Sequence, residues 1–157
     1  MTVGLKVILV RHGESTSTVD NPERPLAITG RQHAEQMASW LHGCGYEVEK
    51  IVHSSKLRAR QTAKIFGSRL GLHAAHVREI DGVKPHDAPE PIVELLQAEL
   101  QPLLIVSHLP FLNRLASLML TDDPHRLQFQ FSDAGALILT RVSGGWRIEA
   151  VVGHQMI

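Results

Sequence analysis

Two short apolar runs dominate the hydrophobic pattern of this chain, and each ends abruptly in charged or polar residues. Residues 7–10 read VILV and residues 103–106 read LLIV. Unbroken aliphatic runs of this length are typical of strands that are buried on both faces of a parallel sheet. Arg11 and His12 follow the first run, and His108 lies two residues after the second. These positions point to function, because ligands of open α/β sheets bind at the carboxyl ends of the strands.

Segments with helical periodicity separate the strands. Thr29 and Gln32 form a capping-box pattern at the start of the first helix, and Ser55 is expected to cap the second. Two weaker strands are predicted at residues 50–54 and within residues 72–80. Apolar residues at helical spacing predict four helices, over residues 34–41, 57–70, 92–100 and 112–119.

The order of these elements predicts an α/β fold. Strands alternate with helices along most of the chain, and two final strands flank Ser143-Gly144-Gly145, which is a hairpin signal. Alternation of this kind favours right-handed crossovers between parallel strands. We therefore expect a three-layer, mostly parallel sheet with helices on both faces and an antiparallel hairpin at its C-terminal edge. The length of 157 residues predicts a single domain spanning residues 1–157.

Charge and cysteine content narrow the classes of partner. The 16 lysines and arginines balance the 16 aspartates and glutamates, which gives no argument for a nucleic acid or an anionic membrane as partner. Cys44 is the single cysteine, which suits a reducing compartment because no internal disulfide can form. No run approaches membrane-spanning length, and the start of the chain lacks a signal-peptide pattern. We expect a cytoplasmic protein.

Unusual polar groups follow each of the four parallel strands. They are Arg11 and His12, then Arg58, then Glu79, and finally His108. Arg58 lies in the first turn of its helix, where a basic residue opposes the helix dipole unless an anion binds there. Guanidiniums bind phosphoryl oxygens in a bidentate manner, and the chain has no P-loop motif for nucleotides. The pattern predicts a phosphate pocket with a nucleophile and an acid.

No metal or cofactor is expected from the sequence. The ten histidines include His73, His76 and His86, but their spacing lacks the partner ligands and the helical setting of known zinc patterns.

Three motifs in this order resemble the signatures of the histidine phosphatase superfamily, also called the phosphoglycerate mutase-like family. They are RHGE at residues 11–14, SSKLRARQTA at residues 54–63 and SHLP at residues 107–110. The stretches RPLAITG at residues 24–30 and SHLPFLNRLA at residues 107–116 look most like the SixA-type phosphohistidine phosphatases.

The resemblance implies that His12 is the nucleophile and that Arg11, Arg58 and His108 bind the phosphoryl group. Glu79 in REIDG is similar to the family stretch that supplies a proton donor, although the aromatic residues that usually follow are absent. Alternatives for the acid are Asp81, Asp87 or a water molecule, because geometry decides which group can act as a general acid.

The expected mechanism is in-line attack by neutral His12 on phosphorus, which gives a phosphohistidine that water then cleaves. Arg11, Arg58 and a protonated His108 would hold the negative charge. A weak acid favours a phosphohistidine substrate in a partner protein, such as a phosphotransfer domain or phosphocarrier, because imidazole is a good leaving group. One alternative is a small-molecule phosphomonoesterase, favoured if residues 82–91 fold over as a lid. Another is a non-catalytic phosphate-binding regulatory module.

Overall fold

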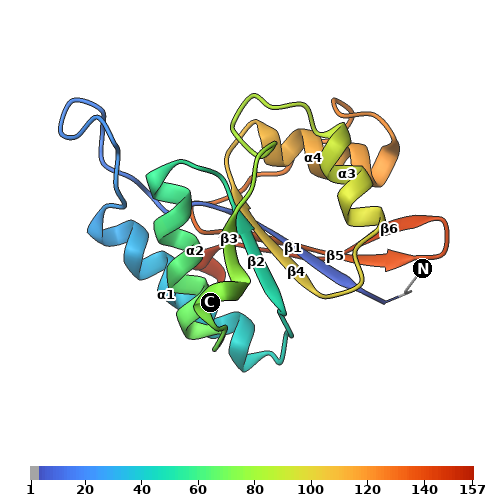
Figure 1. Cartoon of the computed structure of the whole chain (residues 1–157), viewed down its shortest axis with the longest axis horizontal. Coiled ribbons are helices and arrows are strands. Elements are labelled where there is room, and N and C mark those ends of the chain that lie inside the picture. The colour runs from blue at the N-terminus through green and yellow to red at the C-terminus, as the bar shows by residue number, and fades with distance from the viewer. Residues whose placement is uncertain (1–3) are drawn as a thin grey trace.

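The computed structural model describes residues 4–157, and within them the strands form one sheet in the order β3-β2-β4-β1-β5-β6 (Figure 1). The first four strands along the chain run parallel to one another, and β5 pairs antiparallel with both β1 and β6. This sheet confirms the predicted α/β class and the C-terminal hairpin. The strands are β1 (Lys6–Arg11), β2 (Lys50–His53), β3 (Val77–Glu79), β4 (Leu103–Ser107), β5 (Ala136–Val142) and β6 (Gly145–Val152).

Helices cover both faces of the sheet, as Figure 1 shows. Alternate residues of β1 point to opposite faces. Val7 and Leu9 belong to a core cluster that includes buried residues of α3 and α4, whereas Ile8 and Val10 pack with buried residues of α1 and α2. This arrangement explains why the central strands are apolar throughout. The helices are α1 (Ile28–Gly43), α2 (Leu57–Arg69), α3 (Glu90–Gln97) and α4 (Phe111–Thr121), with 3-10 turns at Ala74–His76 and His154–Met156.

The two predicted helix caps are wrong. Ala27 and Lys56 occupy the cap positions of α1 and α2, and neither cap makes a side-chain hydrogen bond. Thr29 lies inside α1, where its hydroxyl donates to the Glu14 carboxylate instead of capping the helix. Ser54 rather than Ser55 accepts a hydrogen bond from the backbone at the start of α2. The Thr29 side chain, which the local motif assigns to capping, instead joins α1 to the loop that follows β1.

The first part of the segment between β3 and α3 is hydrogen-bonded to the rest of the protein. The Ile80 backbone N–H donates to the His53 carbonyl oxygen at 3.0 Å. Val83 is fully buried, and its carbonyl oxygen accepts a hydrogen bond of 2.6 Å from the hydroxyl of Ser107 at the end of β4. Closure of residues 82–91 over a substrate stays a prediction, since this anchor fixes only the first part of the segment. No helix within residues 4–157 has both the length and the apolar character that crossing a membrane requires.

Candidate active site

His12 is held in a defined orientation directly after β1. Its ring nitrogen Nδ1 lies 2.7 Å from the carbonyl oxygen of Gly13, and its backbone N–H donates to the carbonyl oxygen of Ser107 at 3.0 Å. A carbonyl oxygen can only accept, so Nδ1 carries the proton and Nε2 keeps its lone pair. The backbone bond also joins β1 to β4, because Arg11 and Ser107 are register partners in the sheet.

Residues 131–135 hold residues 11–14 in place through three backbone groups and the Asp133 carboxylate. These residues belong to no helix or strand, and their bonds fix the positions of the His12 backbone and the Arg11 guanidinium. The bonds run from Arg11 Nη1 to Phe131 O at 2.9 Å, from Glu14 N to Asp133 Oδ2 at 2.8 Å, from Ala134 N to His12 O at 3.2 Å and from Arg11 N to Gly135 O at 3.1 Å.

His108 faces His12 from the end of the adjacent strand. The two ring centroids lie 5.0 Å apart with the planes tilted by 56°. Nε2 of His108 lies 2.5 Å from the hydroxyl oxygen of Ser54, whereas its Nδ1 is buried and has no hydrogen-bond partner within residues 4–157. A buried polar atom without a partner is costly and usually marks a place for a ligand.

Thr62 connects Arg58 to the loop that carries His12. The hydroxyl of this buried threonine donates to the Arg58 carbonyl oxygen at 2.8 Å and accepts from the Gly13 backbone N–H at 3.0 Å. The α2 segment therefore positions Arg58 relative to His12 through one side chain. Nε of Arg58 and Nε of Arg11 are both buried without a hydrogen-bond partner among the described residues.

Arg24 lies near enough to His12 and Arg58 for its charge to lower the pKa of both, although the sequence did not predict it as a site residue. Its guanidinium donates to the carbonyl oxygen of Thr16 at 3.2 Å and to the hydroxyl of Ser15 at 3.0 Å. The backbone φ of Arg24 is 52°, in the left-handed region that non-glycine residues seldom adopt. Arg24 lies in a loop and does not directly follow a strand in the sequence, so the expectation that site residues follow strands could not identify it. The sequence signal that did include Arg24 is the stretch RPLAITG.

Burial and neighbouring cations keep both imidazoles neutral. Burial, together with the charges of Arg58, Arg11 and Arg24, lowers the pKa of His12 to about 4, against the opposing bond to Gly13. Burial and the charges of its neighbours, His12 foremost, lower the pKa of His108 to about 3. Without a ligand, the lowered pKa favours a neutral His108, and its protonation in the phosphoryl complex stays a prediction. A bound dianion would raise this pKa, since it favours the charged ring.

The arginines form an uncompensated positive cluster. Within residues 4–157, none of Arg11, Arg24 and Arg58 makes an ion pair with a carboxylate. Burial and the charge of Arg24 lower the pKa of Arg58, which shows that the cations repel one another. Guanidiniums beside neutral imidazoles provide positive charge and hydrogen-bond donors of the kind that suit a tetrahedral oxyanion.

Glu79 lies apart from this cluster. It ends β3, the edge strand of the sheet, and three strand spacings of about 4.8 Å place β3 about 14 Å from β1. Its exposed side chain lines a separate cavity between α2 and β3. Asp81 is exposed, and Asp87 accepts a hydrogen bond from the Lys84 backbone at 2.9 Å. The acid role of Glu79 stays a prediction.

A second cluster, formed by His33, Asp133 and His154, lies beside the 11–14 loop. Asp133 Oδ2 lies 2.9 Å from His33 Nδ1, and Asp133 Oδ1 lies 3.3 Å from His154 Nε2. The two imidazoles stack with a centroid distance of 3.5 Å and an angle of 8°. Parallel rings direct their nitrogen lone pairs into separate planes, so the arrangement favours two N–H donors on one carboxylate over a shared cation.

The sheet and its polar edge define a class of protein that binds phosphoryl groups next to an unprotonated histidine. The family model of the histidine phosphatase superfamily (branch 1) matches residues 7–84. The phosphohistidine phosphatase SixA of Escherichia coli (strain K12) is 32% identical over 122 residues, which are 72% of this chain and 73% of the relative. The chain belongs to the histidine phosphatase superfamily and is a phosphatase.

Solved structures share the complete fold. A structure of the protein histidine phosphatase SixA complexed with tungstate has a TM-score of 0.85 and 25% identity, covering 97% of this chain and 99% of that one. A mutant phosphoserine phosphatase from Entamoeba histolytica in complex with phosphoserine has a TM-score of 0.72 at 19% identity, with 98% and 99% coverage. The second likeness concerns the fold alone.

Proposed function

We propose that this protein removes the phosphoryl group from phosphohistidine in a partner protein, through a covalent phosphohistidine on His12 and without a metal ion. The observation that carries the proposal is the hydrogen bond of 2.7 Å between Nδ1 of His12 and the Gly13 carbonyl oxygen. It leaves the Nε2 lone pair free for attack on phosphorus. The lowered pKa of about 4 supports the same role, because the ring is then unprotonated at neutral pH.

The reaction has two displacements at phosphorus. In the first, Nε2 of His12 forms a bond to phosphorus while the bond to the substrate imidazole breaks, and the departing nitrogen keeps the electron pair. The substrate leaves as neutral imidazole because its other ring nitrogen carries a proton taken from solvent, and the His12 ring keeps its Nδ1 proton and is positively charged. In the second, a water oxygen attacks phosphorus, the bond to Nε2 breaks and inorganic phosphate leaves. His12 is returned to its neutral form, and the water proton passes to phosphate or solvent.

The proposed phosphoryl ligands are Arg11, Arg24, Arg58 and His108. Buried nitrogens without a partner among the described residues support this assignment for Arg11, Arg58 and His108, and the effect of the Arg24 charge on the pKa of His12 supports it for Arg24. The tungstate in the related SixA structure supports it as well, because tungstate is a tetrahedral oxyanion. His108 would donate from Nδ1 while Nε2 accepts from the Ser54 hydroxyl. Loss of one such preorganised donor is expected to cost roughly 3 kcal/mol of barrier.

The choice of phosphohistidine as substrate rests on the leaving group. Within residues 4–157, no carboxylate forms a hydrogen bond or an ion pair with either site imidazole. A phosphomonoester requires a proton donor for its alkoxide, whereas imidazole departs with little help. The relatives named SixA support the same substrate class. The exposed, free thiol of Cys44 fits the cytoplasmic location expected from the sequence.

Phosphate release tests the proposal. Wild-type protein and His12→Ala are compared, with and without a chelator, on a histidine-phosphorylated phosphotransfer domain and on a panel of small phosphomonoesters. We expect chelator-insensitive release from the phosphoprotein, loss of that release in His12→Ala, and no loss in His42→Ala, which replaces an exposed histidine of α1. Rapid quenching should trap an acid-labile, base-stable phosphoenzyme.

The other outcomes assign different functions. Release from small esters alone indicates a phosphomonoesterase, and a concurrent loss in Glu79→Gln would make Glu79 the proton donor. If phosphate is released from none of the substrates, the protein is a non-catalytic phosphate-binding module. In the proposed function, Glu79→Gln hydrolyses phosphohistidine with the wild-type kcat.

A further inference from the structure

The segment that leads into α2 and the helix itself are unusually basic. Residues 54–69 contain five lysines and arginines and no aspartate or glutamate. Arg58 belongs to the phosphate site, and Arg69 pairs with Glu35 at 3.2 Å. The other three, Lys56, Arg60 and Lys64, are exposed, and we call them the basic strip.

The basic strip runs along one side of α2. Its residues are spaced at i, i+4 and i+8, and residues four apart are neighbours on a helix surface. Lys56 precedes the helix, and its charge lowers the pKa of His108, so the strip begins beside the phosphate site. At a rise of 1.5 Å per residue it extends about 12 Å away from the site.

This arrangement is unfavourable for the helix by itself. Like charges at i and i+4 destabilise a helix by about 0.2–0.5 kcal/mol per pair, and cations in the first turn oppose the helix dipole. Within the described part of the chain, no carboxylate forms an ion pair with any residue of the basic strip. An anionic partner would compensate both costs.

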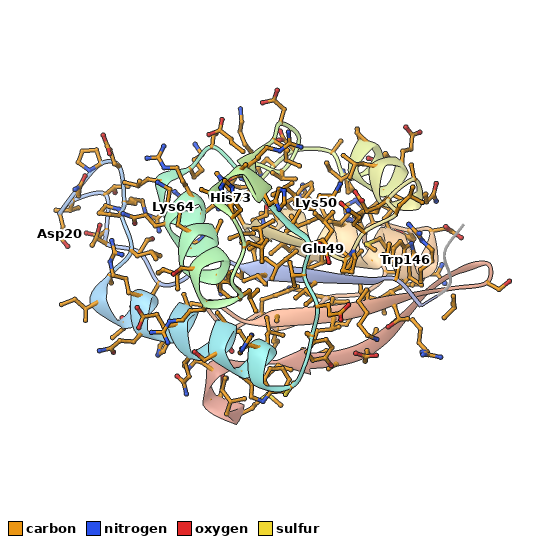
Figure 2. All side chains as sticks on the ribbon, turned by 60° about the horizontal axis from the view of Figure 1, so that its bottom comes forward. Asp20, Glu49, Lys50, Lys64, His73 and Trp146 are labelled. Atoms are coloured by element: carbon orange, nitrogen blue, oxygen red, sulfur yellow. The ribbon has the colours of Figure 1, made fainter. Side chains whose placement is uncertain are left out.

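A cavity of about 560 Å³ adjoins the strip between α2 and β3. Arg60 and Lys64 contribute to its lining, and Leu72 and Val77 supply apolar surface. In Figure 2, Lys64 on α2 and His73, in the segment before β3, lie on the same exposed side of the molecule. A partner that places acidic side chains on the strip can therefore insert a side chain into the cavity.

We propose that the basic strip and this cavity are the docking surface for an acidic face of the phosphorylated protein substrate. The inference rests on the proposed function and names the chemistry of its partner. When the phosphohistidine of a folded protein enters the site, the protein surface around that phosphohistidine must contact the residues that border the site. Residues of α2 form part of that border. The strip is narrow and borders a hollow, which fits a protein surface better than a flat anionic membrane.

Charge reversal tests the docking surface. The variant Arg60→Glu/Lys64→Glu is compared with Arg147→Glu, which reverses an exposed charge on β6. Substrates are a histidine-phosphorylated phosphotransfer domain and phosphoramidate, which has no protein surface. We expect kcat/KM for the phosphoprotein to fall about tenfold or more, chiefly through KM, because charges at an interface rim act on association. Phosphoramidate hydrolysis should be unchanged in both variants.

Salt dependence gives an independent readout. Added salt should lower kcat/KM of the wild type for the phosphoprotein, since salt screens exposed charges. It should have little effect on kcat/KM of the double variant. If the double variant hydrolyses the phosphoprotein with wild-type kinetics, the docking surface is overturned and the proposed function is not. An equal loss with phosphoramidate would also overturn it, because the site itself would then be damaged.

Two further results separate the remaining explanations. If the wild type hydrolyses small esters but not the phosphoprotein, both the proposed function and the docking surface are overturned. The wild type could bind phosphatidylserine vesicles while the double variant does not, with the same phosphoprotein kinetics in both. That result would assign the basic strip to membrane binding instead.

Discussion

The imidazole rings of His12 and His108 face each other with their centroids 5.0 Å apart, and a different partner holds each ring. His12 is bound by the Gly13 carbonyl oxygen through Nδ1, and His108 contacts the Ser54 hydroxyl through Nε2. Each ring therefore keeps its other nitrogen for a ligand. The pair belongs to adjacent parallel strands, so the sheet register sets the distance between the rings.

The lowered pKa values of these two histidines predict how stability depends on pH. In the unfolded chain each ring takes up a proton near pH 6.5, whereas the folded protein binds it only near pH 4 or 3. The unfolded state then binds more protons, so the free energy of unfolding should fall as pH drops from 6.5 to 5, by on the order of 1.4 kcal/mol per pH unit for each ring.

Denaturant titrations across this range measure the effect. His108→Gln should show a shallower pH slope than wild type, and His42→Gln should keep the wild-type slope. Above pH 5 the carboxylates with lowered pKa, such as Asp133, contribute little, because their stabilisation is lost only at lower pH. An identical slope in His108→Gln would contradict a neutral, buried ring.

Arg24 should strengthen oxyanion binding and lower the pKa of His12. In Arg24→Met we expect tungstate to bind roughly tenfold more weakly, equivalent to about 1.4 kcal/mol, and the pKa of His12 to rise because one positive charge is removed. Calorimetry gives the affinity, and NMR titration of the ring gives the pKa. Arg147→Met serves as the control, and unchanged values in Arg24→Met would exclude this arginine from the site.

Thr62 should matter through its hydroxyl rather than through its volume. Thr62→Val removes the bonds to Gly13 and Arg58 while preserving the side-chain shape. We expect a loss of stability of about 1–3 kcal/mol, because the Gly13 N–H is left buried without a partner, and a lower kcat. Thr62→Ser retains the hydroxyl and should recover most of the activity. Equal activity of the two variants would show that the hydroxyl does not position Arg58.

Gly30 should tolerate no side chain. A Cβ at Gly30 would collide with the backbone of Glu14, and one at Gly13 would lie 2.6 Å from the Gly30 carbonyl oxygen. Gly30→Ala is expected to lower the free energy of unfolding by about 1–3 kcal/mol and to reduce activity by moving the 11–14 loop. Gly43→Ala, which meets nothing within 4 Å at the end of α1, should be neutral or slightly stabilising. Thermal unfolding compares the two.

The sequence by itself predicts the strands, the helices and the polar groups that follow the strands at one edge of the sheet. The apolar runs at residues 7–10 and 103–106 predict buried strands, and Arg11, His12 and His108 follow them closely, so the sequence predicts that these residues lie at one edge of the sheet. Arg58 was found because a basic residue in a first helical turn is locally unfavourable.

Only the tertiary structure decided which polar groups reach the site. Strand order placed Glu79 on the edge strand, because the sheet inserts β4 between β1 and β2, and no local pattern encodes that order. Arg24 joins the site from a loop, through hydrogen bonds to residues eight and nine positions away in the chain. The local pattern predicts that Thr29 caps its helix, but folding brings the Glu14 carboxylate beside it, and the Thr29 hydroxyl donates to that carboxylate instead. Contacts between segments that are distant in the chain depend on how the layers pack, and that packing is settled only in the folded molecule.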